Sequence, residues 1–195
     1  MDKAKRLKAL HEKWLSECTC GLKKTATQGV PGHGNADATI IFIGEAPGAK
    51  EDAGGKPFVG AAGKFLDEML ASIKMKREDI YITNLVKYRP PENRDPTPKE
   101  ISECSLWLKE EVELIDPTLI ITLGRYAMNN FFPEKKISES HGEIFTTESL
   151  GKVRYILPLY HPAAALYNGA LRETLKKDFK KIPKILKKLE QNSKS

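Results

Sequence analysis

Three polar side chains with the potential to do chemistry, Glu45, Asn84 and His161, each stand at or just after the end of an apolar run typical of a buried strand. Each has a structural explanation when taken alone. Asn84 could cap a turn, His161 could be a satisfied core histidine, and Glu45 could pair with Lys87 or Arg89. Because the ends of parallel strands meet along one edge of a sheet, we expect the three side chains to share a site.

The first of these residues belongs to a glycine-rich stretch, residues 39–63, which reads TIIFIGEAPGAKEDAGGKPFVGAAG. Gly44 and Ala46 flank Glu45, and the aromatic residue Phe58 follows further along. In open α/β sheets, ligands bind beyond the carboxyl ends of the strands. An ordinary strand-to-helix turn is the alternative, but acidic and aromatic side chains are unusual on a turn without function.

Motif spacing excludes several kinds of nucleotide and hydrolase site. Neither Gly44 nor Gly60 is followed by the Gly-Lys-Ser/Thr of a phosphate-binding loop, and no dinucleotide fingerprint is present. The chain has no Gly-x-Ser-x-Gly elbow and no cysteine at a strand end. An aromatic ring, an amide, a histidine and acidic groups remain, beside Arg- and Lys-rich loops. That set of groups favours recognition of a base extruded from DNA.

These residues must be positioned by alternating strands and helices. Strand patterns occupy residues 39–43, 79–86, 118–123 and 153–160, and helical patterns occupy 7–15, 65–73, 98–115, 125–131 and 171–189, the last interrupted by Pro183. This order predicts a three-layer α/β/α fold with a central, mostly parallel four-stranded sheet. Residues 22–38 are expected to form a loop and residues 133–152 a polar excursion.

Length and composition favour one domain, residues 1–195, with a basic helical C-terminal tail, 171–195. No apolar stretch approaches the roughly 20 residues that a membrane span needs. The charged, amphipathic start lacks a signal-peptide pattern, so we expect a cytoplasmic protein and, by default, a monomer. Three cysteines argue against a secreted disulfide framework and favour reduced thiols or a metal site.

The tail contains nine Lys or Arg against three Asp or Glu, which accounts for the whole formal net charge of +6. Such a segment could attract nucleic acid or an anionic membrane surface. A solvated helix face is the alternative interpretation.

Several long motifs, in order along the chain, carry a resemblance to a known family: GEAPGAKEDAGGKPFVGAAGKFLDEML, YITNLVKYRPPENRDPTPKEI, LIITLGRYA and LYHPAAALY. Over roughly residues 17–181 the chain resembles family four of the uracil-DNA glycosylases, the thermostable iron–sulfur branch. The resemblance implies that the protein flips uracil out of DNA and hydrolyses its N-glycosidic bond, leaving an abasic site.

The resemblance also implies a role for each motif residue. Phe58 would stack on the flipped uracil, Asn84 would read its polar edge and reject cytosine, and His161 would donate a hydrogen bond toward uracil O2. Glu45, with the backbone from Gly44 to Ala46, would hold water or stabilise the cationic sugar. The main branch of the superfamily has Asp where Ala46 stands, so we expect a dissociative reaction. Glu51 and Asp52 would support the loop or substitute in part.

The resemblance also implies contacts to DNA from further positions. Leu166, in the segment 164–167, would wedge into the vacated base stack from the minor groove. Arg89, Arg94 and some lysines of the tail would contact phosphates.

The family holds a 4Fe-4S cluster through four cysteines, and here the matching positions read Glu17, Cys20, Tyr88 and Cys104. Cys18 could replace the first ligand, giving at most three thiolates, whereas such clusters normally take four. Two alternatives follow. In the first, Cys18, Cys20 and Cys104 hold a cluster. In the second, the three thiols pack with Tyr88 as a small apolar plug that joins the N-terminal segment to the Pro-rich loop, residues 87–96.

Two other functions stay open from the sequence. The same fold could excise another deaminated base such as hypoxanthine, because a few pocket groups decide base choice. A catalytically silent DNA-binding module is the second, supported by the basic tail and the missing cluster ligands.

Overall fold

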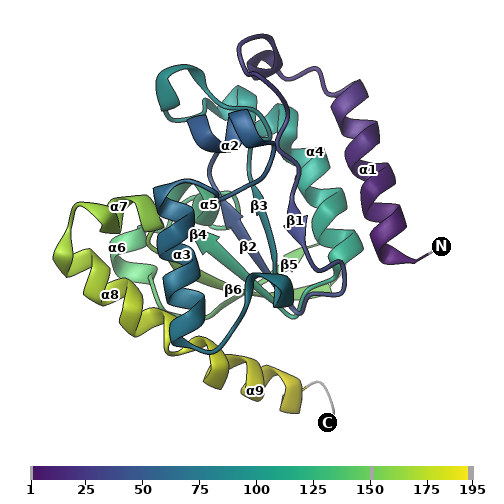
Figure 1. Ribbon diagram of the computed structural model, residues 1–195. Helices are drawn as coiled ribbons and strands as arrows, with labels where there is room; N and C mark the ends of the chain where they lie inside the picture. Colours follow the sequence, from purple (N-terminus) through teal and green to yellow (C-terminus); the bar gives the residue numbers. More distant parts are fainter. Residues whose placement is uncertain (1, 150–151, 193–195) are drawn as a thin grey trace.

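A mixed six-stranded sheet between two layers of helices forms the fold (Figure 1). The computed structural model describes residues 2–149 and 152–192. The strand order is β1-β3-β2-β4-β6-β5. The strands are β1 (His33–Gly34), β2 (Ile40–Gly44), β3 (Tyr81–Asn84), β4 (Leu119–Leu123), β5 (Phe145–Ser149) and β6 (Lys152–Leu159).

Nine α-helices and three short 3-10 helices (Gly21–Lys24, Arg77–Asp79 and Pro91–Asn93) occur in the described part of the chain. The α-helices are α1 (Lys3–Glu17), α2 (Ala49–Gly54), α3 (Ala61–Ser72), α4 (Pro98–Ile115), α5 (Arg125–Asn129), α6 (Ile137–Ser140), α7 (Pro162–Leu166), α8 (Gly169–Phe179) and α9 (Ile182–Asn192). The start of α4 is fixed by a capping box between Thr97 and Glu100, with Pro98 in the first turn.

The three-layer arrangement follows from alternation along the strands. In β2, Ile41 and Ile43 face a core cluster under α1, α4 and α5. Ile40 and Phe42 face the opposite cluster, under α3, α7, α8 and α9. Because successive side chains point to opposite faces, a strand covered on both sides reads as a continuous apolar run. The prediction of a three-layer α/β/α fold is confirmed.

The predicted number of strands is wrong. The four expected strands, β3, β2, β4 and β6, are parallel neighbours, but β1 and β5 each add an antiparallel strand at one edge. β1 has only two residues, in a stretch rich in Gly and Pro, and β5 reads FTTES, so neither shows a strand pattern. The excursion predicted at 133–152 therefore contains α6 and β5, and residues 150–151 lie outside the described part.

Two helix predictions also need correction. The glycine-rich stretch 39–63 contains the short helix α2, which was not predicted because glycines flank it on both sides. Pro183 does not itself break the tail helix, because α8 ends at Phe179 and Pro183 occupies the second position of α9. A proline is tolerated there since the first helical N–H groups have no intrahelical partner. Residues 193–195 of the tail lie outside the described part.

Parallel pairing brings the ends of β2 and β3 into register, with Gly44 opposite Asn84. β6 delivers His161 at the same edge, where the backbone N–H of Gly124 donates to the carbonyl of Leu159 at 2.8 Å. Within the described residues, no helix is both long and apolar enough to cross a bilayer.

Candidate active site

A small cavity of about 160 Å³ lies at the carboxyl ends of β2, β3 and β6. It is lined by Ala46, Gly48, Glu51, Phe58, Ala62, Asn84, His161 and Ala163. Larger hollows of about 240 to 510 Å³ occur elsewhere among the described residues, but none of their linings combines an aromatic ring, an amide and a histidine. The small cavity is therefore the candidate site, and it brings Phe58, Asn84 and His161 together as expected.

The amide of Asn84 and the ring of Phe58 close around Gly44. A Cβ atom on Gly44 would lie 2.4 Å from Asn84 Oδ1 and 2.6 Å from Phe58 Cζ, so glycine is required here by space. Asn84 is 2% exposed, and its Oδ1 has no hydrogen-bond partner among the described residues. A buried, unsatisfied amide oxygen costs free energy unless a ligand pairs with it, so Asn84 Oδ1 is an acceptor left free for a ligand.

His161 stands at the N-cap of α7, and its ring centroid lies 5.7 Å from that of Phe58. The backbone N–H of Ala163 donates to Nδ1 at 3.2 Å. Burial lowers the pKa of His161 to about 4, although the nearby Glu51 carboxylate opposes the shift. The ring is therefore neutral near pH 7, and with Nδ1 accepting, its proton resides on Nε2. That N–H is available as a donor.

The backbone of Phe58 adopts a left-handed conformation, with φ of 53°, that is uncommon for an aromatic residue. Arg77 holds it: the guanidinium donates to the carbonyl of Phe58 and, at 3.3 Å, to that of Pro57. Asp67 accepts from Arg77 Nε at 2.8 Å and fixes the guanidinium. Sequence reasoning missed Arg77, because nothing local signals a contact across 19 positions.

Glu51 and Asp52 support the loop, as expected. Glu51 Oε1 accepts from the backbone N–H groups of Val59 and Gly60 at 2.8 and 2.7 Å, just before α3. Asp52 accepts from the backbone N–H and the hydroxyl of Thr27. Glu51 also lines the cavity and is the one acidic side chain in that lining.

Glu45 is not part of the cavity lining, although its neighbour Ala46 is. Burial raises the pKa of Glu45 to about 7; the negative charge of Asp95 adds to the shift, and Arg125 opposes it. The alternative that Glu45 pairs with Lys87 is not what the structure shows, because Lys87 pairs with Glu111 in the interior.

The predicted DNA contacts lie outside the cavity. Arg89 Nε donates to Asn93 at 2.8 Å, and Arg94 forms a two-pronged ion pair with Glu100. Leu166 is partly buried against the core, whereas the next residue, Tyr167, is 95% exposed. Tyr167 is a large side chain that the sequence motif alone did not single out.

The residues at the family's cluster positions do not fit a four-thiolate cluster. Cys18, Cys20 and Cys104 are buried free thiols, and the Tyr88 ring packs edge-on against Trp14, with centroids 5.8 Å apart. A hydrogen bond between the Cys20 and Cys104 thiols lowers the pKa of Cys20 and raises that of Cys104.

Tyr88 is 2% exposed, and burial raises its pKa to about 12, so a neutral phenol stands where the family has its third cluster cysteine. Across residues 2–149 and 152–192, no three or more His, Cys, Asp or Glu side chains are arranged to hold a metal ion. The packing expected of an apolar plug is present, since the three thiols, Tyr88 and Trp14 belong to one core cluster.

Comparison with known proteins gives consistent results. The chain is 51% identical to a type-4 uracil-DNA glycosylase of Archaeoglobus fulgidus over 85% of its own length and 86% of that protein. It is 40% identical to a type-4 uracil-DNA glycosylase of Thermotoga maritima, over 89% and 92% of the two chains. A type-5 uracil-DNA glycosylase of Thermus thermophilus is 32% identical, over 68% of each chain.

A family model described as the uracil DNA glycosylase superfamily matches residues 31–190, the range that holds every lining residue of the cavity. With this match and the type-4 relatives covering most of its length, the chain belongs to the uracil-DNA glycosylase superfamily.

Proposed function

We propose that the protein excises uracil from DNA by binding the extruded base in the cavity between Phe58, Asn84 and His161. The observation that supports this most directly is the buried, unpartnered Oδ1 of Asn84 in that cavity. The type-4 relatives are named for the same activity.

Two groups would select the base. The Phe58 ring offers a face for stacking, and the Asn84 amide offers an acceptor and a donor to the polar edge of uracil. Uracil presents an N–H and a carbonyl to that amide. Cytosine presents a ring nitrogen acceptor and an amino donor. In the same orientation, the Asn84 amide would place acceptor against acceptor and donor against donor, and cytosine would be rejected.

His161 would stabilise the leaving group. As the N-glycosidic bond breaks, negative charge develops on uracil O2, and the neutral His161 ring can donate its Nε2–H to that oxygen. A preorganised donor of this kind commonly lowers the activation barrier by about 3 to 4 kcal/mol. The hydrogen bond from the Ala163 N–H to Nδ1 fixes the orientation of the ring that makes this donation.

Glu45 would act on the sugar side of the bond, in its ionised form. It follows β2 directly, beside the backbone of Gly44 and Ala46, where a carboxylate can orient water or stabilise an oxocarbenium-like sugar. Because Ala46 offers no side-chain base, we infer a dissociative reaction in which Glu45 supplies charge.

The DNA would lie across the rim of the cavity. Arg89 and Arg94 would contact phosphates, and Leu166 would enter the vacated stack from the minor groove.

We also propose that this protein acts without an iron–sulfur cluster, because thiols, Trp14 and Tyr88 fill the corresponding region with packed side chains. Iron analysis and visible absorption of anaerobically purified, active protein test this. Iron well below one atom per chain, with full activity, is expected. Stoichiometric cluster iron would contradict the proposal.

The function is tested with duplexes that carry one uracil, hypoxanthine or cytosine, treated with alkali after incubation. Cleavage at uracil alone is expected. Cleavage only at hypoxanthine would support the alternative substrate, and salt-sensitive binding without cleavage would support a silent DNA-binding module. Asn84→Asp should lose uracil cleavage, with any gain on cytosine read in the same assay.

A further inference from the structure

A buried ion pair lies directly behind Asn84. Lys87 and Glu111 are both fully buried, and Lys87 Nζ donates to Glu111 Oε2, to Thr83 Oγ1 and, at 3.0 Å, to the main-chain carbonyl of Asn84. Lysine and glutamate are almost never fully buried unless they are paired. Such a pair is weak evidence for stability, since its desolvation cost offsets much of its attraction, so another role is indicated.

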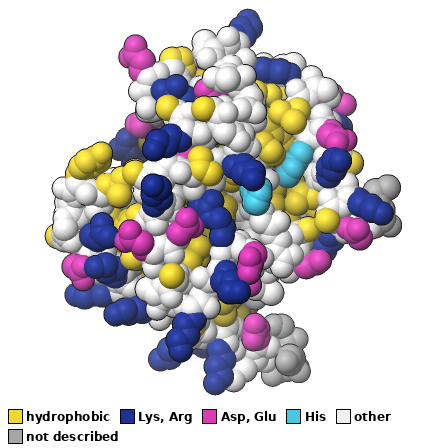
Figure 2. Space-filling view, viewed as in Figure 1, with side chains coloured by type: hydrophobic (Ala, Val, Ile, Leu, Met, Phe, Trp, Pro, Cys, Tyr) yellow, Lys and Arg dark blue, Asp and Glu magenta, His cyan; other side chains and the backbone are white. Residues whose placement is uncertain are grey.

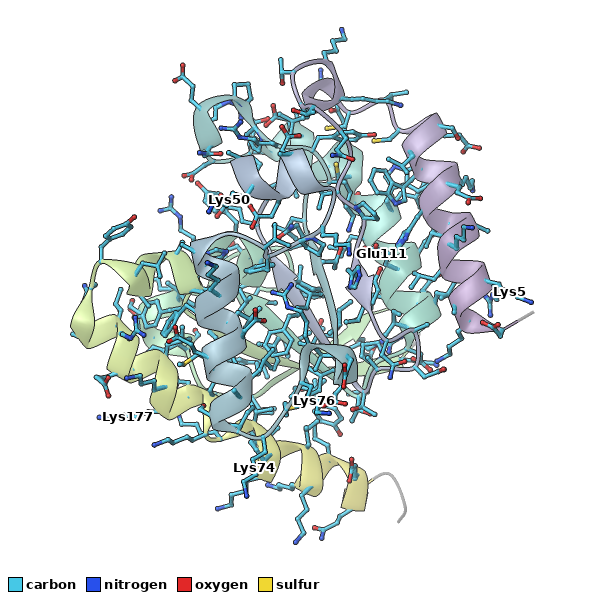
Figure 3. The ribbon with its side chains drawn as sticks, in the orientation of Figure 1. Lys5, Lys50, Lys74, Lys76, Glu111 and Lys177 are labelled. Carbon is cyan, nitrogen blue, oxygen red and sulfur yellow. The ribbon has the colours of Figure 1, made fainter. Side chains whose placement is uncertain are left out.

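Glu111 is the centre of this network and lies on α4 between α1 and the sheet (Figure 3). Burial alone would raise the pKa of its carboxyl, but Lys87 and His11 lower it, to about 2. The carboxylate receives donors from α1, from the loop before β1, from β3 and from the loop after β3: His11 Nε2, Gly32 N, Tyr81 OH, Thr83 Oγ1 and Lys87 Nζ. Its position is therefore fixed from several sides.

The main chain must orient the reading amide. Asn84 Oδ1 has no partner among the described residues, so no hydrogen bond to protein holds that end of the side chain. Asn84 is the last residue of β3 and lies opposite Gly44 of β2, and the next two backbone N–H groups, of Leu85 and Val86, donate to the carbonyls of Gly44 and Glu45 at 3.0 and 3.2 Å. Lys87 provides a side-chain tether to the Asn84 backbone at this point.

We propose that Lys87, held by Glu111, is a positioning residue for base recognition, because it fixes the end of β3 and thereby the direction of the Asn84 amide. This inference rests on the proposed role of Asn84 in uracil excision. A displacement of about 1 Å in a positioned group can cost on the order of 100-fold in rate, so a tether on the backbone is sufficient to affect the reaction.

The test uses the double variant Lys87→Met/Glu111→Gln, which removes both charges while keeping side-chain length. Thr83→Val is a milder variant that removes one hydroxyl shared by Lys87 and Glu111, in case the double variant does not fold. Arg154→Met is the matched control, since Arg154 is 5% exposed and its guanidinium donates to Asp116 at 2.7 Å, near the amino ends of β4 and β6.

Single-turnover excision at saturating enzyme, affinity for abasic duplex and the unfolding midpoint are measured for each folded variant. The double variant should excise uracil roughly 10- to 100-fold more slowly, with affinity for abasic duplex within about twofold of wild type. It should also discriminate less between uracil and cytosine. Thr83→Val should show a smaller loss of the same kind, whereas Arg154→Met should lose stability only.

Two results would overturn the positioning role. One is unchanged excision and discrimination in Thr83→Val and the double variant. The other is a loss no larger than that of Arg154→Met at a matched fall in the unfolding midpoint. Wild type and Asn84→Ala are measured in parallel, so that failure of the positioning role can be told apart from failure of the proposed function. If wild type releases no uracil, the proposed function fails, and if Asn84→Ala is fully active, the recognition role of Asn84 fails; the positioning role falls in either case.

Discussion

At the scale of the residue, His161 is distinguished by the way its protonation is fixed. Burial holds its pKa near 4, and the Ala163 N–H occupies Nδ1, so one neutral tautomer faces the cavity. A neutral donor needs no proton transfer to stabilise the leaving base. Over the ordinary working range of pH the ring therefore keeps the same form.

His161→Ala should slow single-turnover excision about 100- to 1,000-fold, the usual loss for one preorganised donor. Affinity for abasic duplex should change little, because the donor acts where charge develops during bond cleavage. Since His161 stays neutral above its pKa of about 4, the ratio of wild-type to variant rates should be constant between about pH 6 and 8. A ratio that changes with pH in this range would show that a charged imidazole takes part.

Leu166 and Tyr167 are neighbouring candidates for the wedge, the side chain that fills the gap left by the extruded base. Leu166 was expected from its motif, but it is partly buried against the core, while Tyr167 is 95% exposed. A wedge fills the gap left in a duplex, and its loss should slow excision from double-stranded DNA far more than from single-stranded DNA. We predict this pattern for Leu166→Ala and a smaller effect for Tyr167→Ala. The reverse order would assign the wedge to Tyr167.

At the scale of the element, burial raises the pKa of Glu45, and the loops after two other strands supply charges that shift it further. Asp95, in the Pro-rich loop after β3, accepts from Arg125 Nη2 at 2.9 Å and from the Tyr126 hydroxyl at 2.5 Å, both at the start of α5. The Asp95 charge helps to raise the pKa of Glu45, and that of Arg125 lowers it. The chain thus places a tunable carboxylate at the end of β2.

Activity should rise with pH through about 7, because Glu45 is protonated below its raised pKa and ionised above it. Asp95→Asn removes a negative neighbour and leaves Arg125 without its carboxylate, so the midpoint should move to lower pH. Glu68→Gln, which removes the exposed carboxylate paired with Arg172, is the control and should leave the midpoint in place. An unshifted midpoint in Asp95→Asn would contradict this account of Glu45.

The elements that read clearly in the sequence are those with strong local patterns. The four parallel strands are buried on both faces and appear as apolar runs, whereas β1 and β5 are edge strands without one. Phe58, Asn84 and His161 were found because each sits in a motif at or after a strand end. Arg77 and Glu111 were not, because their contacts to Phe58 and Lys87 depend on how distant segments pack, which no local pattern contains.

At the scale of the whole molecule, positive charge is concentrated away from the cavity. Lys and Arg side chains gather over α8 and α9 in Figure 2, and Figure 3 places Lys177 of α8 well apart from Lys50 of α2, the helix beside the cavity. Some tail lysines were expected to contact phosphates. This arrangement suits long-range attraction of DNA better than contact at the reacting nucleotide.

Charge reversal on α9, as Lys184→Glu/Lys188→Glu, should therefore lower kcat/KM at low salt and weaken its salt dependence. The single-turnover rate at saturating enzyme should stay within about twofold, since the attraction acts before the base is bound. The same reversals would reduce that saturated rate if the tail touched the reacting nucleotide.

The packing of Trp14 against Tyr88 also gives the molecule a built-in optical probe. Both tryptophans of the chain, Trp14 and Trp107, belong to the core cluster under α1 and α4, and the opposite cluster contains neither. Intrinsic fluorescence therefore reports on one layer only. If α1 detaches before the sheet unfolds, tryptophan emission will move to longer wavelength while most of the helical circular dichroism is retained.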